Sequence, residues 1–273
     1  MKFIALTLKY LKHNFFKLLI LAAGPAVLFA FFARPSLMLV FITQYGAEKL
    51  TFGNIYAALF PAVKWWWLFL LLPVLAIFMS MTYGFLENHM RMGVFGPKSF
   101  IRKLNYGAGG FVLPFIILSA VYFLWRFLTA TVLYLINYLF FDVWGSYGLA
   151  LAFSIAAVLG SVYIFISAAA YFLLWPPVLQ ISGYGFGDSW YYQLKMLSDH
   201  RRKLKLAILF PLALTAAVVL IFIQFAGAYI VCAYAVCYAF EFTYLPALSM
   251  ATYFDITGSE RKDLVSRKKY YLR

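Results

Sequence analysis

The sequence predicts an all-α membrane protein, a polytopic bundle of six transmembrane helices with both termini in the cytoplasm. Of its 273 residues, 65% are hydrophobic and only 12% are charged. A water-soluble domain cannot bury so large an apolar fraction, because its surface needs polar atoms. The apolar runs are continuous rather than alternating, and several reach the ~18 residues of a bilayer-crossing helix, which favours helices over a barrel.

The distribution of basic residues predicts the orientation. The net charge is +14, and nineteen of the 23 Lys and Arg residues fall in segments 2–17, 91–103, 195–205 and 261–273. Six spans would place all four segments on one side of the membrane. Because cytoplasmic loops carry an excess of Lys and Arg, that side is predicted to be the cytoplasm. The expected location is therefore the cell membrane, as a multi-pass protein.

The first two spans are expected at about 18–33 and 63–86. Residues 2–17 place Ile4, Leu8, Leu11 and Phe15 on one helical face, which predicts either an interfacial helix or a plain basic flank before the first span. The stretch 36–60 mixes apolar and polar residues, and we expect it outside, partly in the interface. Three consecutive tryptophans, 65–67, mark the second span's outer boundary.

The third span begins near residue 107, in an apolar stretch that is longer than one crossing needs. Residues 107–141 are almost wholly apolar. The excess predicts either tilt or a helix that extends beyond the membrane. The fourth span, 148–175, is expected to break or kink at Pro176-Pro177. A short helix capped by Asp188 or Ser189 should follow.

The last two spans are expected at about 206–225 and 228–254, and the whole chain, 1–273, is interpreted as a single transmembrane domain. An internal repeat of 62–128 in 148–225 is one interpretation of two recurrences. Tyr-Gly-Phe occurs at 83–85 and 184–186, and Arg-Lys-Leu occurs at 102–104 and 202–204. The alternative is coincidence, because these residue types are common in this chain.

Two charged residues lie inside predicted spans. Glu241 falls near the middle of the sixth span, where an ionisable group is costly and faces a protein interior or a wet cavity. It is either part of a proton or cation pathway, or a structural residue paired with a tyrosine or an arginine. Arg126 lies toward the outer end of the third span, where it can snorkel. Its pairing with Glu241 would require tilted or offset helices.

The basic flanks have a second interpretation besides topology. Cations beside membrane helices attract anionic headgroups by ~1 kcal/mol each near the surface. Membrane lipids are therefore the expected partners at the cytoplasmic face, and nucleic acid is not expected. The candidate contacts are Lys98, Arg102, Lys103, Arg201, Arg202, Lys203 and Lys205.

Sequence motifs add little information about function. Cys232 and Cys237 lie five residues apart in an apolar run and point in different directions on a helix. The three histidines have no metal-binding spacing, and we find no nucleophile elbow or Walker A motif. The sequence therefore predicts no catalytic residue, no metal and no cofactor.

Three function classes follow from these observations. The first is a non-enzymatic integral membrane protein that assists transport or membrane assembly, as a homo-oligomer or as a subunit of a larger complex. The second is a transporter or channel for a small solute, ion or lipid, with Glu241 in the pathway. The third is a membrane enzyme that acts on lipid headgroups near the basic face.

Three stretches carry a resemblance to known proteins: the basic N-terminal flank, WPPVLQISGYGF at 175–186 followed by a basic short helix, and YFDITGSERKDL at 253–264. In this layout the chain resembles uncharacterised bacterial six-helix integral membrane proteins. Examples are the YesL-like proteins and the membrane domains attached to some glycerophosphodiester phosphodiesterases. The resemblance implies a bacterial inner membrane protein, and it supplies no site residues.

Overall fold

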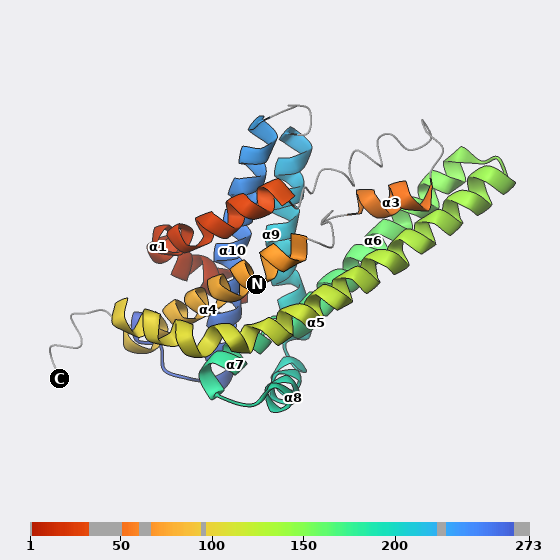
Figure 1. The fold of residues 1–273 in the computed structure, drawn as a ribbon. Helices are drawn as coiled ribbons and strands as arrows, with labels where there is room; N and C mark the ends of the chain where they lie inside the picture. The colour runs from red at the N-terminus through yellow and green to blue at the C-terminus, as the bar shows by residue number, and fades with distance from the viewer. Residues whose placement is uncertain (1, 33–50, 60–66, 94–96, 223–227, 265–273) are drawn as a thin grey trace.

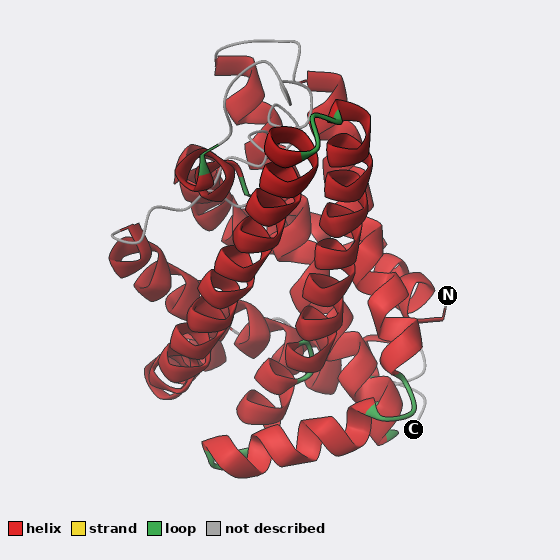
Figure 2. Ribbon diagram, turned by 90° about the vertical axis from the view of Figure 1, so that its right-hand side faces the viewer, coloured by secondary structure: helices red, strands yellow, loops and turns green. Residues whose placement is uncertain are grey.

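The computed structural model describes residues 2–32, 51–59, 67–93, 97–222 and 228–264, and the regular secondary structure in these ranges is helical (Figure 2). The elements are α1 (Lys2–Phe32), α3 (Phe52–Ala58), α4 (Leu68–Met92), α5 (Pro97–Asn137), the π-helix η2 (Tyr138–Val143), α6 (Tyr147–Phe172), α7 (Trp175–Ser182), α8 (Phe186–Leu197), α9 (Arg201–Phe222), α10 (Ala228–Thr257) and the 3₁₀ turn η3 (Lys262–Leu264).

Within the described residues, five helical segments are long and apolar enough to cross a bilayer: Lys2–Phe32, Leu71–Met92, Val112–Val143, Tyr147–Ser182 and Val231–Thr257. They correspond to five of the six expected spans, so the architecture is that of a multi-pass membrane protein. The remaining expected span, 206–225, falls on α9 and runs into residues outside the described part.

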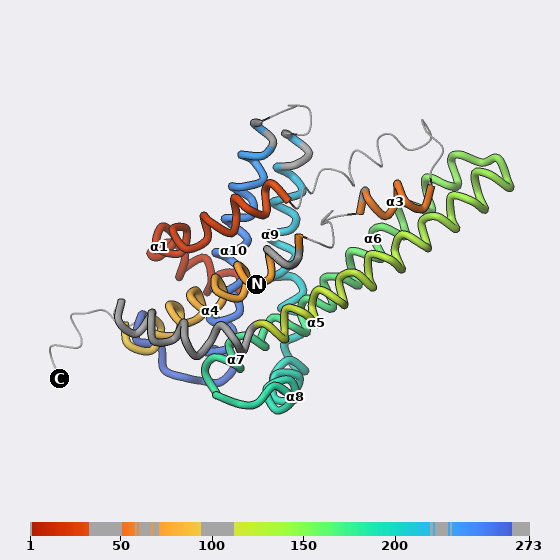
Figure 3. The backbone as a smooth tube through the Cα atoms, viewed as in Figure 1, coloured from red at the N-terminus to blue at the C-terminus, as the bar shows by residue number. Residues whose placement is uncertain are grey.

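The helices form a bundle with a long projecting hairpin (Figure 1). Helix α1 packs along α10, and α4 and α9 lie beside them. Helices α5 and α6 run antiparallel, away from this bundle, to a turn at 144–146 (Figure 3). Helix α5 alone has 41 residues, or about 60 Å at 1.5 Å per residue, twice a bilayer core of ~30 Å. The expected excess length therefore takes the form of one extended helix.

The N-terminal segment continues without a break into the first span. Residues 2–17 and the first span form a single helix of 31 residues, with Pro25 inside it. Of the predicted apolar face, Leu11 is buried and Ile4 and Phe15 pack against the same hydrophobic core, whereas Leu8 is exposed. Both the basic and the apolar parts of α1 share hydrophobic clusters with α10, so this face packs on protein.

Contacts between the start of α1 and the end of α10 place these two segments at the same end of the bundle. The ammonium of Lys2 forms an ion pair of 2.8 Å with Asp255, near the end of α10. Gly93, just after α4, has a left-handed backbone (φ +70°). Such a backbone favours glycine over residues with a Cβ. The carbonyl of Lys262 lies close to this turn, because a Cβ at position 93 would be 3.4 Å from its oxygen, which is van der Waals contact.

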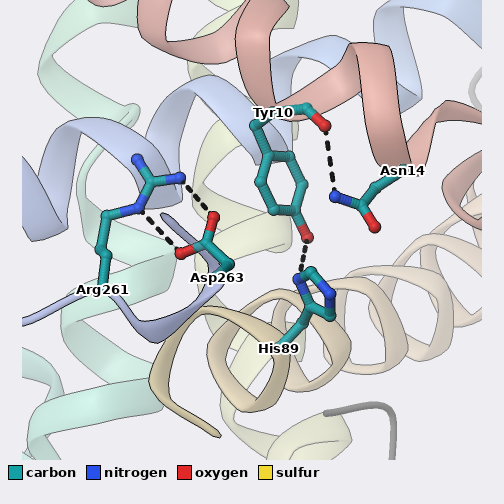
Figure 4. A network of polar contacts seen from close by, with 5 residues as sticks. All are labelled: Tyr10, Asn14, His89, Arg261 and Asp263. Atoms are coloured by element: carbon teal, nitrogen blue, oxygen red, sulfur yellow. Dashed lines mark hydrogen bonds and ion pairs between the residues drawn. The ribbon is translucent and has the colours of Figure 1, made fainter. Parts of the chain in front are cut away.

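A polar cluster completes this end of the bundle (Figure 4). The hydroxyl of Tyr10 on α1 lies 3.2 Å from Nδ1 of His89 on α4, and Asn14 donates to the carbonyl of Tyr10. Arg261 donates twice to Asp263, at 3.2 and 2.8 Å, and its guanidinium lies 5.9 Å from the centre of the Tyr10 ring. These contacts hold the segment after α10 against α1 and α4.

Prolines shape the helices, and neighbouring hydroxyls complete their hydrogen bonding. The predicted break at Pro176-Pro177 is confirmed, because α6 ends at Phe172 and α7 begins at Trp175. Pro177 has no N–H for the carbonyl of Leu173, four residues earlier, and Ser249 of α10 donates to that carbonyl instead. In α9, Pro211 likewise leaves the carbonyl of Ala207 without its helical donor.

Tyr244 of α10 supplies that second donor. Its buried hydroxyl donates to the Ala207 carbonyl at 3.2 Å. Two carbonyls released by proline on two different helices are thus both satisfied by hydroxyls from α10. The Leu173 carbonyl belongs to a candidate membrane span, where hydrocarbon offers no water to bind, and both bonds join α10 to its neighbours.

The segment after α7 shows that the predicted helix cap was wrong, and it bears on the predicted internal repeat. The N-cap of α8 is Gly185 rather than Asp188 or Ser189, and Ser189 instead donates to the Phe186 carbonyl. The Tyr-Gly-Phe recurrence also differs in setting, because residues 83–85 lie inside α4 whereas 184–186 lie at the start of α8. The internal repeat stays a prediction.

A double-mutant cycle tests the role of Tyr244 in α9. We expect Tyr244→Phe to destabilise the protein by about 1 kcal/mol, the scale of hydrogen bonds inside membranes. In a Pro211→Ala background the new backbone N–H at position 211 can serve the same carbonyl, so the loss should shrink. Thermal unfolding in detergent measures both; an equal loss in the two backgrounds would contradict this role for Tyr244.

Candidate lipid-binding site

A partly open cavity of about 510 Å³ lies between α4, α5 and α6, with Phe29 of α1 at its edge. Its lining is almost wholly apolar, and Ser119 and Tyr122 are its hydroxyl-bearing members. The other lining residues come from α4 (Leu71, Leu72, Leu75), α5 (Phe115, Leu118, Val121, Leu124, Trp125, Leu128) and α6 (Ile164, Phe165, Ala168, Ala169, Phe172). All of them belong to the candidate membrane spans.

Local sequence explains why the cavity forms there. Toward the tip of the hairpin, Trp125 Nε1 donates to the Ser161 carbonyl at 3.1 Å, and Thr129 and Ser161 share a hydrogen bond of 2.8 Å. These bonds hold α5 and α6 together. One to two turns along α6, Ala168 and Ala169 present only methyl groups, which leaves space between the helices. Cavities of ~300–1,000 Å³ with apolar walls are typical ligand sites.

On α9, two of the predicted basic residues are held against tyrosines of α6. The guanidinium of Arg201 lies 4.5 Å from the centre of the Tyr171 ring, and the ammonium of Lys205 lies 4.5 Å from the centre of the Tyr163 ring. Lys205 also donates to the Tyr163 hydroxyl at 3.2 Å. Both are cation–π contacts within the usual ~6 Å.

The other predicted lipid contacts have different surroundings. Arg202 and Lys203 are exposed, as is Arg201, but neither contacts an aromatic ring among the described residues. Among the described residues, no carboxylate pairs with any of the four cations at 201–205. Lys98, Arg102 and Lys103 lie on the first turns of α5, and their side chains fall outside the described part.

Glu241 lies on α10 and faces α9. Its Oε1 accepts a hydrogen bond of 2.6 Å from the buried hydroxyl of Thr215. Cys237, one turn earlier on α10, lies beside the same hydroxyl. The partner of Glu241 is thus a threonine, where a tyrosine or an arginine was expected, and Glu241 is not among the residues that line the cavity.

Arg126 does not snorkel, because it is only 3% exposed. Its Nε donates to the carbonyl of Tyr56 at 2.9 Å, and its guanidinium lies 4.3 Å from the Tyr56 ring. The last carbonyls of a helix have no intrahelical donor, so a cation there completes α3 and complements its dipole. The structure therefore does not bring Arg126 and Glu241 together.

The cysteines and histidines form no site in the described part of the chain. Cys232 is exposed and Cys237 is buried, and both are free thiols. No group of three or more His, Cys, Asp or Glu residues gathers within the ranges that the structure describes. His89 instead contacts Tyr10 and stacks on Phe85, with 5.9 Å between the ring centres.

Sequence reasoning missed Tyr163 and Tyr171. Their spacing of eight residues, two turns of α6, was the available signal for one helical face. Nothing in the sequence paired that face with α9.

Comparisons of the chain with protein-family models, curated proteins and solved structures found no match.

Proposed function

We propose that this chain is a non-enzymatic integral membrane protein that holds lipid between its helices and in this way assists transport or membrane assembly. The observation that carries the proposal is the apolar cavity between α4, α5 and α6. Its lining residues lie on candidate membrane spans, and lipids would surround its opening in a bilayer. One acyl chain matches its chemistry, because the walls offer dispersion contacts and few hydrogen-bond partners.

We also propose that both ends of the chain face the cytoplasm. Support comes from the charge distribution and from the Lys2–Asp255 ion pair, which joins the start of α1 to the end of α10.

A transporter with Glu241 in its pathway is the second candidate function. The observation in its favour is a carboxylate inside a membrane helix that accepts a hydrogen bond from the neutral hydroxyl of Thr215. Intramembrane carboxylates with such neutral surroundings often belong to ion or proton pathways. An enzyme acting on headgroups is less well supported, since the cavity wall is apolar.

Orientation can be tested with single cysteines in a variant that lacks Cys232 and Cys237. We expect Ser259→Cys, in the C-terminal segment, to resist a membrane-impermeant maleimide in intact cells. Asp142→Cys, at the hairpin tip, should react. Both positions are exposed. The reverse labelling pattern would show the opposite orientation.

Filling the cavity tests the lipid proposal. Ala168→Phe should occupy the space between α5 and α6 and exclude an acyl chain. With a phospholipid that carries a photoreactive group in its chain, we expect crosslinking to α5 and α6 peptides in the wild type and its loss in the variant. Ala156→Phe is the matched control, because Ala156 lies exposed on the same helix. Unchanged crosslinking in Ala168→Phe would rule out the cavity as the lipid site.

Glu241→Gln separates the two candidate functions. The change removes the charge, keeps an acceptor for Thr215 and leaves the cavity lining intact. If the lipid proposal is right, crosslinking persists and ion or solute flux in reconstituted vesicles is unchanged. Flux that is present in the wild type and lost in this variant would instead favour a transporter.

A further inference from the structure

We infer that Arg201 and Lys205, together with Tyr171 and Tyr163, form a specific binding site for the phosphate group of an anionic phospholipid. The site lies where α9 packs against α6. The inference rests on the proposed function, because it names the class of lipid and the place of its headgroup.

The first argument is the geometry of the two cations. Residues 201 and 205 are one turn apart on α9, so they share one helical face. Each is held over a tyrosine ring at 4.5 Å, and the Lys205 ammonium also donates to the Tyr163 hydroxyl. Long basic side chains usually lose rotamer freedom when they bind. Here the tyrosines have already restricted both cations, so a phosphate meets a pre-organised pair.

The second argument is unused hydrogen-bonding capacity. An ammonium has three donors and a guanidinium five. Tyr163 takes one donor of Lys205, whereas Arg201 contacts Tyr171 through the ring face. The nearest acid in sequence, Asp199, accepts a hydrogen bond from Ser198 and does not pair with either cation. The remaining donors suit phosphate oxygens, which form strong charge-assisted bonds.

The third argument is an electrostatic cost that an anion would relieve. Helix α9 begins with Arg201, Arg202 and Lys203, and its first turn has no acidic residue. Cations at this end of a helix are opposed by the positive end of its dipole. A bound phosphate would offset both the mutual repulsion of the cations and this dipole.

The fourth argument distinguishes a lipid from a free phosphate. Next to the two cations, the outer surfaces of α9 and α6 are apolar: Leu206 and Leu209 on α9 and Leu159 on α6 are all exposed. A headgroup held at Arg201 and Lys205 would lay its chains on these side chains. A soluble phosphate gains nothing from them, so we assign the site to a phospholipid.

The test compares two variants that remove the same charge. The full-length protein is placed in phosphatidylcholine nanodiscs with phosphatidylglycerol added, and binding of spin-labelled phosphatidylglycerol is titrated. We expect Arg201→Gln with Lys205→Gln to weaken binding by more than about 100-fold, because the change removes charge-assisted hydrogen bonds to the phosphate as well as surface charge. Arg202→Gln with Lys203→Gln removes surface charge alone, at about fivefold for each cation, so it should weaken binding by no more than about 25-fold. Equal losses in the two variants would overturn the site and leave only general surface charge.

Three further measurements distinguish the alternatives. Tyr163→Leu with Tyr171→Leu keeps every charge but removes both rings, and it should also weaken phosphatidylglycerol binding; full binding would contradict the inference even if the arginine–lysine variant fails to fold. Inorganic phosphate should not displace the lipid, and complete displacement would assign the site to a free anion. Ala168→Phe should keep the headgroup preference while it loses chain crosslinking, so failure of the cavity and failure of this site give different results.

Discussion

Backbone hydrogen bonding in hydrocarbon is the constraint on which the rest of this structure depends. Every carbonyl in a membrane span needs a donor from the protein, because no water is available. Pro177 removes one such donor in a candidate span, Pro211 removes a backbone donor in α9, and hydroxyls from α10 replace both. Helix α10 therefore does more than fill space at the centre of the bundle. It bonds to the junction of α6 with α7 and to α9, and this fixes the places where the site residues meet.

The same constraint accounts for the charge buried on α5. Arg126 would be costly at its depth if it faced lipid. It instead satisfies carbonyls at the end of α3, which have no donor within that short helix. Among the described residues, no ion pair joins Arg126 to Glu241. Glu241 instead accepts a hydrogen bond from the hydroxyl of Thr215, so it is the less compensated of these two residues.

The sequence allowed the helices to be predicted but not their partners. Hydropathy and length located the spans on α1, α4, α5, α6 and α10, since these signals are contained in each segment. The pair Arg126 and Tyr56 is separated by 70 residues, and periodicity carries no signal for such a contact. The 31-residue α1 was likewise divided in two by its change of composition, although packing on α10 keeps it continuous. The tyrosines that hold Arg201 and Lys205 were missed for the same reason.

Helix α6 contributes residues to both the apolar cavity and the proposed phosphate site, and it does so from two different faces. Ile164, Ala168 and Phe172 line the apolar cavity toward α4 and α5, whereas Tyr163 and Tyr171 meet the cations of α9. The long α5–α6 hairpin extends away from the bundle, so its position relative to α9 depends on contacts near its base. An anionic headgroup at Arg201 and Lys205 would strengthen one of those contacts, and a chain in the cavity would strengthen another. Lipid composition would then set how firmly the hairpin is held against the bundle.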